Sequence, residues 1–281
     1  TFSFPALTLV FAQQEPLSAA DLVAYQKALF QARQGKHPDA LQALKKLFVK
    51  APLASEWRGR LAADTLFMHG VIEYEKRSMI KAEEYLKAAL AAREEMFGQN
   101  DSSVAETFSR LGMLYRRTAD YDLSEQYLQQ ALAIQRKVLG PQNVIVAYSL
   151  NNLGNLYKSR NQPQKAIEHY DAALEIYQSL KKDSLRLDGE GMTFLNYGIL
   201  NHRMGAYAQA EQQVLDGLAD FKAVYGPTSK ELGRFWFELA RLAIDQSDFS
   251  QSLIYADSAS QAWEGKNVPE YIYIKIIQGI A

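Results

Sequence analysis

The four histidines are the residues whose spacing could most directly indicate a metal site, because two histidines four residues apart on a helix can bind zinc together. They stand far apart in the chain, at His37, His69, His169 and His202. The chain contains no Cys, which excludes disulfides, thiol catalysis and cysteine-based zinc sites. We therefore predict neither a metal centre nor a cofactor.

Sequence motifs of hydrolases and nucleotide-binding enzymes are also missing. The chain has no G-x-S-x-G nucleophile elbow and no Walker loop. The stretch "GEGMTF" at residues 189–194 begins like a dinucleotide-binding loop but lacks the third Gly and a preceding strand, so we interpret it as a loop. His69 stands in a column of leucines such as Leu111 and Leu153, so we expect a packed side chain and not a ligand. These observations predict no catalytic residue and no intrinsic enzyme activity.

Composition and charge set broad limits on the class of protein. The chain has 281 residues, of which 48% are hydrophobic and 22% charged, as in ordinary globular proteins with a sizeable core. The formal net charge of -1 argues against a general binder of nucleic acid or of anionic membranes. No stretch reaches the roughly 18 apolar residues that a membrane-spanning helix needs.

The N-terminal stretch "TFSFPALTLVFA", residues 1–12, is mostly apolar and uncharged. Val10 and Ala12 would occupy the −3 and −1 positions of a signal-peptidase site. We therefore interpret residues 1–19 as the remnant of a signal peptide followed by a linker, which predicts export to the periplasm or the extracellular space. The alternative is an apolar segment that docks on the fold of a cytoplasmic protein.

A small residue recurs at a nearly fixed interval of 42, with one interval of 44. The six positions are Ala28, Gly70, Gly112, Gly154, Gly198 and Ala240. Twelve residues after each of these anchors stands a second small residue, namely Ala40, Ala82, Ser124, Ala166, Ala210 and Ser252. Gly inside a helix costs about 1 kcal/mol relative to Ala, so its recurrence indicates that two helices approach closely there. We expect the small residue of the first helix to face the small residue of the second.

Around the anchors, the pattern "LNNLGNLY" followed by "A…LEIY" resembles the tetratricopeptide repeat, in its longer, kinesin-light-chain-like variant of 42 residues. The resemblance covers residues 20–268. It implies an all-α, right-handed superhelical solenoid of antiparallel helix pairs with about six repeats. Residues 269–281 would then form a capping helix or the start of a seventh repeat.

Helix-ending residues agree with a unit of two helices. Gly98, Gly140 and Gly226 lie near the expected ends of second helices, where Gly is a common stop signal. Pro163 lies at the expected start of a second helix, where its missing N–H costs nothing. The two-residue insertion falls in the stretch 181–191, which we predict to be the most irregular connector.

In the resembling family, the first helices of the repeats line a concave surface that binds peptides. The resemblance places the following residues on that groove: Arg110, Met113, Arg116, Arg117, Asn151, Asn152, Asn155, Lys158, Asn196, Ile199, Arg203, Arg234 and Arg241. An Asn amide offers both donors and an acceptor, so it could pair with the backbone of a bound peptide. The alternative is that these asparagines are solvated polar residues between stacked helices.

Charge on the implied groove predicts the kind of partner. Over the third to sixth repeats the inner positions hold seven basic residues, against three acidic residues, Glu106, Glu238 and Asp245. A concave wall of one charge attracts ligands of the opposite charge. We therefore expect a protein or peptide partner that is acidic or carries a C-terminal carboxylate. The alternative is that several arginines pair with carboxylates of neighbouring repeats.

These inferences favour a non-catalytic protein–protein interaction scaffold that belongs to a larger exported protein. The rival function is a structural module that self-associates through its terminal repeats. The apolar stretch "YIYIKII", residues 271–277, would suit either a covering helix or such self-association.

Overall fold

The structure is a computed structural model that describes residues 18–33, 36–50, 56–263 and Gly279. The apolar N-terminal segment with Val10 and Ala12 lies outside the described residues. The same holds for the stretch 271–277. Export and C-terminal capping therefore stay predictions.

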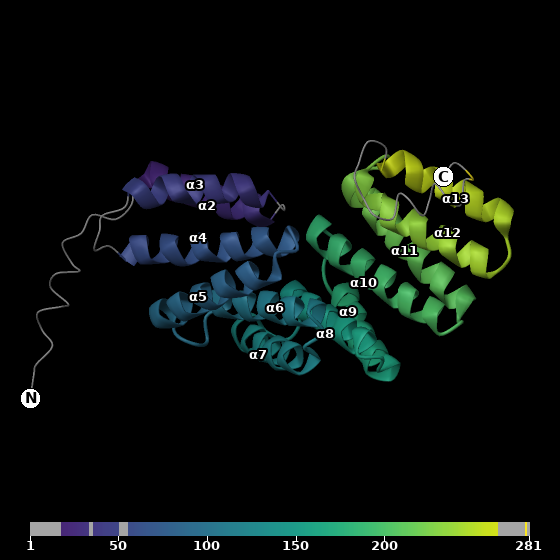
Figure 1. Ribbon diagram of the computed structural model, residues 1–281, viewed down its shortest axis with the longest axis horizontal. Coiled ribbons are helices and arrows are strands. Elements are labelled where there is room, and N and C mark those ends of the chain that lie inside the picture. Colours follow the sequence, from purple (N-terminus) through teal and green to yellow (C-terminus); the bar gives the residue numbers. More distant parts are fainter. Residues whose placement is uncertain (1–17, 34–35, 51–55, 264–278, 280–281) are drawn as a thin grey trace, which may run out of the picture. The chain divides into compact units, whose positions relative to one another are not determined.

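The described residues are α-helical, with one short 3-10 helix and no strand, and the chain divides into two compact units (Figure 1). Unit 1, residues 1–138, holds α2 (Ala19–Arg33), α3 (His37–Lys50), α4 (Glu56–Glu75), α5 (Met79–Phe97), α6 (Ser102–Arg117) and α7 (Tyr121–Leu139). Unit 2, residues 139–281, holds α8 (Val144–Ser159), α9 (Pro163–Ser179), α10 (Ser184–Arg203), α11 (Tyr207–Tyr225), η1 (Lys230–Leu232), α12 (Gly233–Asp245) and α13 (Phe249–Trp263). The all-α prediction is confirmed.

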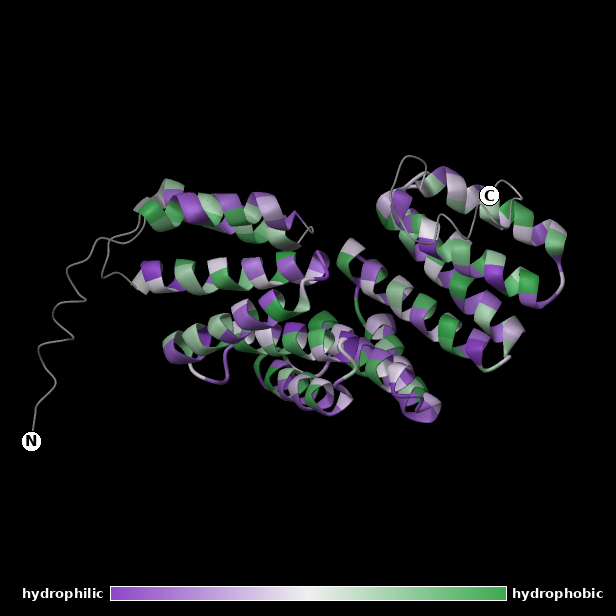
Figure 2. Ribbon diagram, viewed as in Figure 1, coloured by the Kyte–Doolittle hydropathy of each residue, from purple (hydrophilic) through white to green (hydrophobic). Residues whose placement is uncertain are grey.

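Consecutive helices form the predicted pairs, in which α2, α4, α6, α8, α10 and α12 are the first helices. Figure 2 shows hydrophobic and hydrophilic residues alternating along the helices of both units, as expected for amphipathic helices that bury one face. Each first helix also meets the second helix of the preceding pair within its unit, as α6 meets α5 and α10 meets α9. No described helix is long and apolar enough to cross a membrane.

The anchor glycines lie where the two helices of a pair touch, as predicted. A Cβ atom on Gly112 would lie 2.6 Å from Leu128 Cγ, and one on Gly154 would lie 2.5 Å from Tyr170 Cε1. The contact partner differs from the expectation of small facing small, because it is a large side chain sixteen residues after the anchor. The second small residue of the pair takes part in this contact through its backbone, because the carbonyl oxygen of Ser124 would be 3.2 Å from a Cβ on Gly112. The missing Cβ of the anchor therefore makes room for a large side chain of the second helix.

The turn between the two helices of a pair has the same backbone form in five repeats. Seven residues after each anchor, Arg77, Ala119, Asn161, Gly205 and Ser247 have positive φ angles between 59° and 79°. The next residue donates its N–H to a carbonyl five residues earlier, for example from Gln162 to Tyr157 at 2.8 Å. This bond is the 6→1 bond of a Schellman motif, which ends a helix on a left-handed residue.

The predicted helix ends are confirmed. Gly98, Gly140 and Gly226 follow α5, α7 and α11 with φ angles of 76°, 83° and 84°, a conformation that Gly adopts without strain. Pro163 is the first residue of α9. Asp101, Asn143 and Asp183 cap the N-termini of α6, α8 and α10 with their side chains.

The prediction of a loop at residues 189–194 is wrong, and most of the connector predicted at 181–191 is helical. Asp183 caps α10, which begins at Ser184 and contains both glycines. A Cβ on Gly189 would clash with the Tyr177 hydroxyl oxygen, and a Cβ on Gly191 would lie 2.7 Å from Phe221 Cδ2. These glycines therefore allow close packing of α10 against α9 and α11, and they do not mark a turn.

Candidate functional site

The predicted groove residues fall in both units, and those of unit 2 lie on three first helices, α8, α10 and α12. Helix α10 contacts both α8 and α12. The predicted positions on these helices are Asn151, Asn152, Asn155 and Lys158 on α8, Asn196, Ile199 and Arg203 on α10, and Arg234 and Arg241 on α12. Successive first helices in unit 2 thus bring the predicted side chains of neighbouring repeats together.

Polar bonds between α8 and α10 involve three of the predicted residues. The Nδ2 atom of Asn196 donates to Asn151 Oδ1 at 3.2 Å. Lys158 Nζ donates to both the backbone oxygen and the Oδ1 atom of Asn196 at 3.3 Å. Asn151 is only 6% exposed, so its amide stabilises the contact between repeats and is not available to a ligand.

Asn152 and Asn155 lie on either side of Gly154 and are both half-buried. Asn155 Oδ1 accepts a hydrogen bond from the Tyr170 hydroxyl at 3.0 Å. That hydroxyl belongs to the ring that packs on Gly154, so Asn155 satisfies a polar group at the helix–helix contact. Within the part of the chain that the structure describes, Asn152 forms no such bond, and its role in binding stays a prediction.

Contacts of a histidine ring with carboxylates join α10 to α12. The buried ring of His202 lies between two carboxylates of α12, with Nδ1 2.6 Å from Glu238 Oε1 and Nε2 2.7 Å from Asp245 Oδ2. Arg241 Nη1 donates to the other oxygen of Glu238 at 2.8 Å. Arg241 is therefore paired within its own helix, and not with a carboxylate of a neighbouring repeat as the alternative interpretation expects.

The remaining predicted side chains of unit 2 differ in exposure. Arg203 and Arg234 are exposed, and neither meets a carboxylate among the described residues. Ile199 is half-buried and packs against the apolar core of α10, α11 and α12, which includes Leu195 and Leu239. Among the predicted residues of unit 2, Asn152, Arg203 and Arg234 are thus those for which the described part of the chain shows no polar partner.

In unit 1 the predicted residues all lie on α6. Arg110, Met113 and Arg116 are half-buried, and Arg117 is exposed. The guanidinium of Arg117 lies 5.0 Å from the centre of the Tyr74 ring on α4, within range of a cation–π interaction. The acidic residue of this set, Glu106, accepts a bond from Arg93 of α5 at 3.3 Å. Carboxylates in the predicted set therefore bind cations of the fold, in both units.

The other histidines contact helical neighbours. The ring of His69 is half-buried and stacks on Tyr85 with ring centres 5.0 Å apart, in agreement with a packing role, and burial lowers its pKa. His169 lies 2.8 Å from the Lys165 carbonyl oxygen and 5.0 Å from the Tyr157 ring. Among the described residues, no group of three or more His, Asp or Glu side chains is arranged to hold a metal ion.

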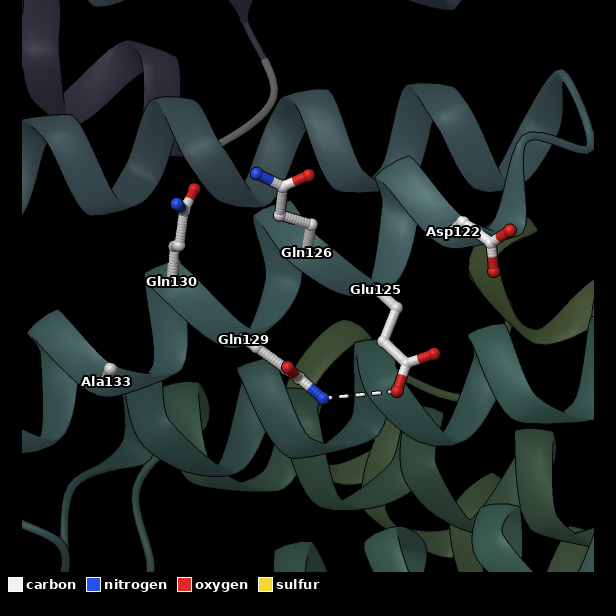
Figure 3. Close-up of a pocket in the computed structure, with 6 residues that line it drawn as sticks. All are labelled: Asp122, Glu125, Gln126, Gln129, Gln130 and Ala133. Atoms are coloured by element: carbon white, nitrogen blue, oxygen red, sulfur yellow. Dashed lines mark hydrogen bonds between the residues drawn. The ribbon is translucent and has the colours of Figure 1, made fainter.

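A surface depression of about 500 Å³ lies along α7 (Figure 3). Its lining residues come from this one helix and are Asp122, Glu125, Gln126, Gln129, Gln130 and Ala133. Gln129 Nε2 donates to Glu125 Oε1 at 3.1 Å, a bond within the exposed face of the helix. A second helix contributes no functional group to this depression, so it provides no catalytic arrangement.

Comparison with known proteins agrees with this architecture. A model of the tetratricopeptide repeat matches residues 61–137 and 103–179. A comparison with curated protein sequences gave no match. Identification of the kinesin-light-chain-like variant stays a prediction.

Solved structures of similar fold cover most of the chain. BtubC (BKLC) from P. vanneervenii is 20% identical with a TM-score of 0.54, over 87% of this chain and 88% of that one. NprR in complex with its cognate peptide NprX is 14% identical with a TM-score of 0.68, over 97% and 75%. A Rap protein complexed with Competence and Sporulation Factor is 16% identical with a TM-score of 0.71, over 96% and 72%. At these identities the likeness is one of fold.

Proposed function

Because this chain is a tetratricopeptide-repeat protein, we propose that it is a non-catalytic scaffold that binds an acidic peptide or protein segment along the first helices of its repeats. Two of the similar folds, NprR and a Rap protein, are described as complexes with a peptide or a named factor. The family and these complexes support a partner-binding role. The charges of this chain support the acidic character of the partner.

One observation carries the proposal. The acidic side chains of the predicted set already have partners in the fold: Glu106 binds Arg93, Glu238 binds Arg241, and both Glu238 and Asp245 contact the His202 ring. In contrast, Arg203 and Arg234 of unit 2 meet no carboxylate among the described residues. Positive charge without an internal partner attracts acidic ligands and speeds their association.

Titration of fluorescent acidic peptides tests this proposal. The double variant Arg203→Glu/Arg234→Glu should bind at least roughly tenfold more weakly than the wild type, because two attractive contacts become repulsive. The control is Arg136→Glu/Lys137→Glu, which makes the same change in net charge on exposed residues of α7. Equal affinities for the wild type and both variants would remove the proposal of a basic binding surface.

Self-association through the terminal repeats is the second candidate, and the outer face of α13 supports it. Phe249, Leu253 and Ile254 are 66%, 45% and 58% exposed. The position of Ile254 in its repeat corresponds to Glu84, Gln126, Glu168 and Gln212 in the four preceding repeats. A concentration-dependent mass in light scattering that Leu253→Glu/Ile254→Glu abolishes would support this function. A monomer at all concentrations would exclude it.

A further inference from the structure

His202 of α10 is buried, yet both nitrogens of its ring face carboxylate oxygens of α12. Nδ1 lies 2.6 Å from Glu238 Oε1, and Nε2 lies 2.7 Å from Asp245 Oδ2. A protonated ring donates a hydrogen bond from each nitrogen, whereas a neutral ring donates from one nitrogen and carries a lone pair on the other. When both carboxylates are ionised, the two contacts are therefore both hydrogen bonds only if the ring is protonated.

The charges of α12 around the ring favour one more positive charge. Glu238 is buried, and its other oxygen accepts a hydrogen bond from Arg241 Nη1 at 2.8 Å. Asp245 is the last residue of α12, where the negative end of the helix dipole disfavours a carboxylate and favours a cation beside it. The two carboxylates and the guanidinium of Arg241 together carry one negative charge. A protonated His202 would balance that charge.

The other elements packed near the ring also carry titratable or charged groups. On α11, the Tyr207 ring meets His202 edge to face, with ring centres 5.9 Å apart. On α8, the ammonium of Lys158 is bonded to Asn196 of α10, and on α10 itself the next residue, Arg203, is exposed. Of these side-chain types, only a histidine ordinarily changes its charge between about pH 5 and 8.

The position of His202 holds a permanent cation in the two preceding repeats. Four residues after its anchor, the third repeat has Arg116, the fourth Lys158 and the fifth His202. Lys158 donates to Asn196 of the next repeat at 3.3 Å. His202 meets Glu238, which holds in the sixth repeat the position that Asn196 holds in the fifth. The contact between successive first helices thus recurs, but at His202 the side chain can lose its charge near neutral pH.

We infer that His202 is a pH-sensitive joint between the fifth and sixth repeats. While the ring is protonated, it bridges Glu238 and Asp245 and holds α12 on α10. When the ring loses its proton, one nitrogen presents a lone pair to a carboxylate oxygen, and that contact opens. The bridged form binds one more proton than the open form, so rising pH favours the open form. The hold of α12 on α10 therefore weakens between about pH 5.5 and 8.5, the range in which histidine ordinarily titrates.

NMR of the ring nitrogens and hydrogen exchange of the full chain test the joint together. With ¹⁵N-labelled histidine, the His202 signals are assigned by their loss in His202→Asn or their shift in Asp245→Asn. They should show two protonated nitrogens at about pH 5.5 and one at about pH 8.5. Protection of the α12 amides, corrected for the intrinsic effect of pH on exchange, should be roughly tenfold higher at the lower pH, the effect of one hydrogen bond to a charged group. Both measurements use the Asp220→Asn background, because burial raises the pKa of Asp220 to about 6 and its titration would otherwise contribute.

Two variants and a matched control separate the joint from a general effect of pH. In His202→Asn, protection of α12 should be the same at both pH values, because the new side chain does not titrate. Asp245 is 52% exposed, so Asp245→Asn should fold, and its amide can either accept from the protonated ring or donate to the neutral one. The pH dependence of this variant should fall well below tenfold. His169→Gln removes another histidine ring of unit 2, one that contacts the Lys165 carbonyl oxygen, and should keep the full dependence.

Three results would overturn the inference. They are a His202 ring that keeps the same number of protons from about pH 5.5 to 8.5, protection of α12 that does not fall over this range, and a pH dependence in His202→Asn equal to that of the wild type. If His202→Asn does not fold, the ring signals of the wild type and the protection measured in Asp245→Asn decide. An Asp245→Asn variant with the full tenfold dependence would then overturn the inference.

Discussion

Arg93 Nη2 lies 2.8 Å from Asp64 Oδ1, in an ion pair between α5 and α4 whose two side chains are only 4% and 8% exposed. The same guanidinium donates through Nη1 to Thr107 of α6 at 2.8 Å. The Tyr25 hydroxyl of α2 donates to the other oxygen of Asp64 at 2.7 Å. One buried pair therefore connects the first helices of three successive repeats in unit 1.

Removal of Arg93 should destabilise unit 1 strongly. Arg93→Met keeps much of the side-chain volume but leaves the Asp64 carboxylate buried without its counter-ion, which typically costs about 3–5 kcal/mol. Hydrogen exchange of α4 to α6 and urea denaturation measure the loss. Arg93→Met/Asp64→Leu should recover most of it, because no uncompensated charge then remains. A single variant as stable as the wild type would show that the pair contributes nothing.

Gly154→Ala should destabilise unit 2 although Ala is the better helix former. The new Cβ would lie 2.5 Å from the Tyr170 ring, which is fully buried, so we expect a net loss of about 1–3 kcal/mol in the free energy of unfolding. Gly59→Ala is the matched control, because its Cβ would meet only the flexible end of Met96 at 2.9 Å. The control should be neutral or stabilising by up to about 1 kcal/mol in thermal or urea unfolding. Stabilisation by both substitutions would contradict the role assigned to Gly154.

Ala119→Gly should stabilise the turn between α6 and α7. Ala119 has a φ of 64°, a left-handed conformation that is strained for Ala and free for Gly. We expect a gain of about 0.5–1 kcal/mol, reduced by the greater freedom of Gly in the unfolded chain. The reverse change at the equivalent turn, Gly205→Ala at φ 79°, should lose a similar amount. Urea midpoints of the two variants should therefore move in opposite directions.

The repeat, the helix pairs and their ends could be predicted because they depend on local spacing. The anchors Gly112 and Gly154 mark helix contacts that recur with the chain's own period, and Gly98 and Pro163 mark ends that single residues determine. Each of these features repeats or acts within a few residues. The sequence therefore predicted them without knowledge of any distant contact.

The site was predicted less completely, because its polar groups are satisfied by residues distant in sequence. Asn151 meets Asn196, 45 residues later, and His202 meets Glu238, 36 residues later. Arg93 belongs to a column that holds Gln135, Tyr177, Phe221 and Trp263 in the four following repeats, so its position gave no sign of a buried ion pair. The same reason explains why the loop predicted at Gly189 is wrong: its neighbour Tyr177 comes from the preceding helix.

Asp220 should make unit 2 less stable as the pH rises from about 4 to about 6. Burial, and next the negative charge of Glu190, raise the pKa of Asp220 to about 6. The folded state therefore holds the proton at pH values where the unfolded carboxyl, with an ordinary pKa near 3.9, has lost it, so the free energy of unfolding falls across this interval. Asp220→Asn should be roughly 1–2 kcal/mol more stable than the wild type at about pH 7.5, a value discounted for partial exposure, and should lose this advantage near pH 4. Urea denaturation at both pH values measures the difference, with Glu211→Gln on the same helix as the control. An advantage of Asp220→Asn that is the same at both pH values would show that ionisation of Asp220 is not its cause.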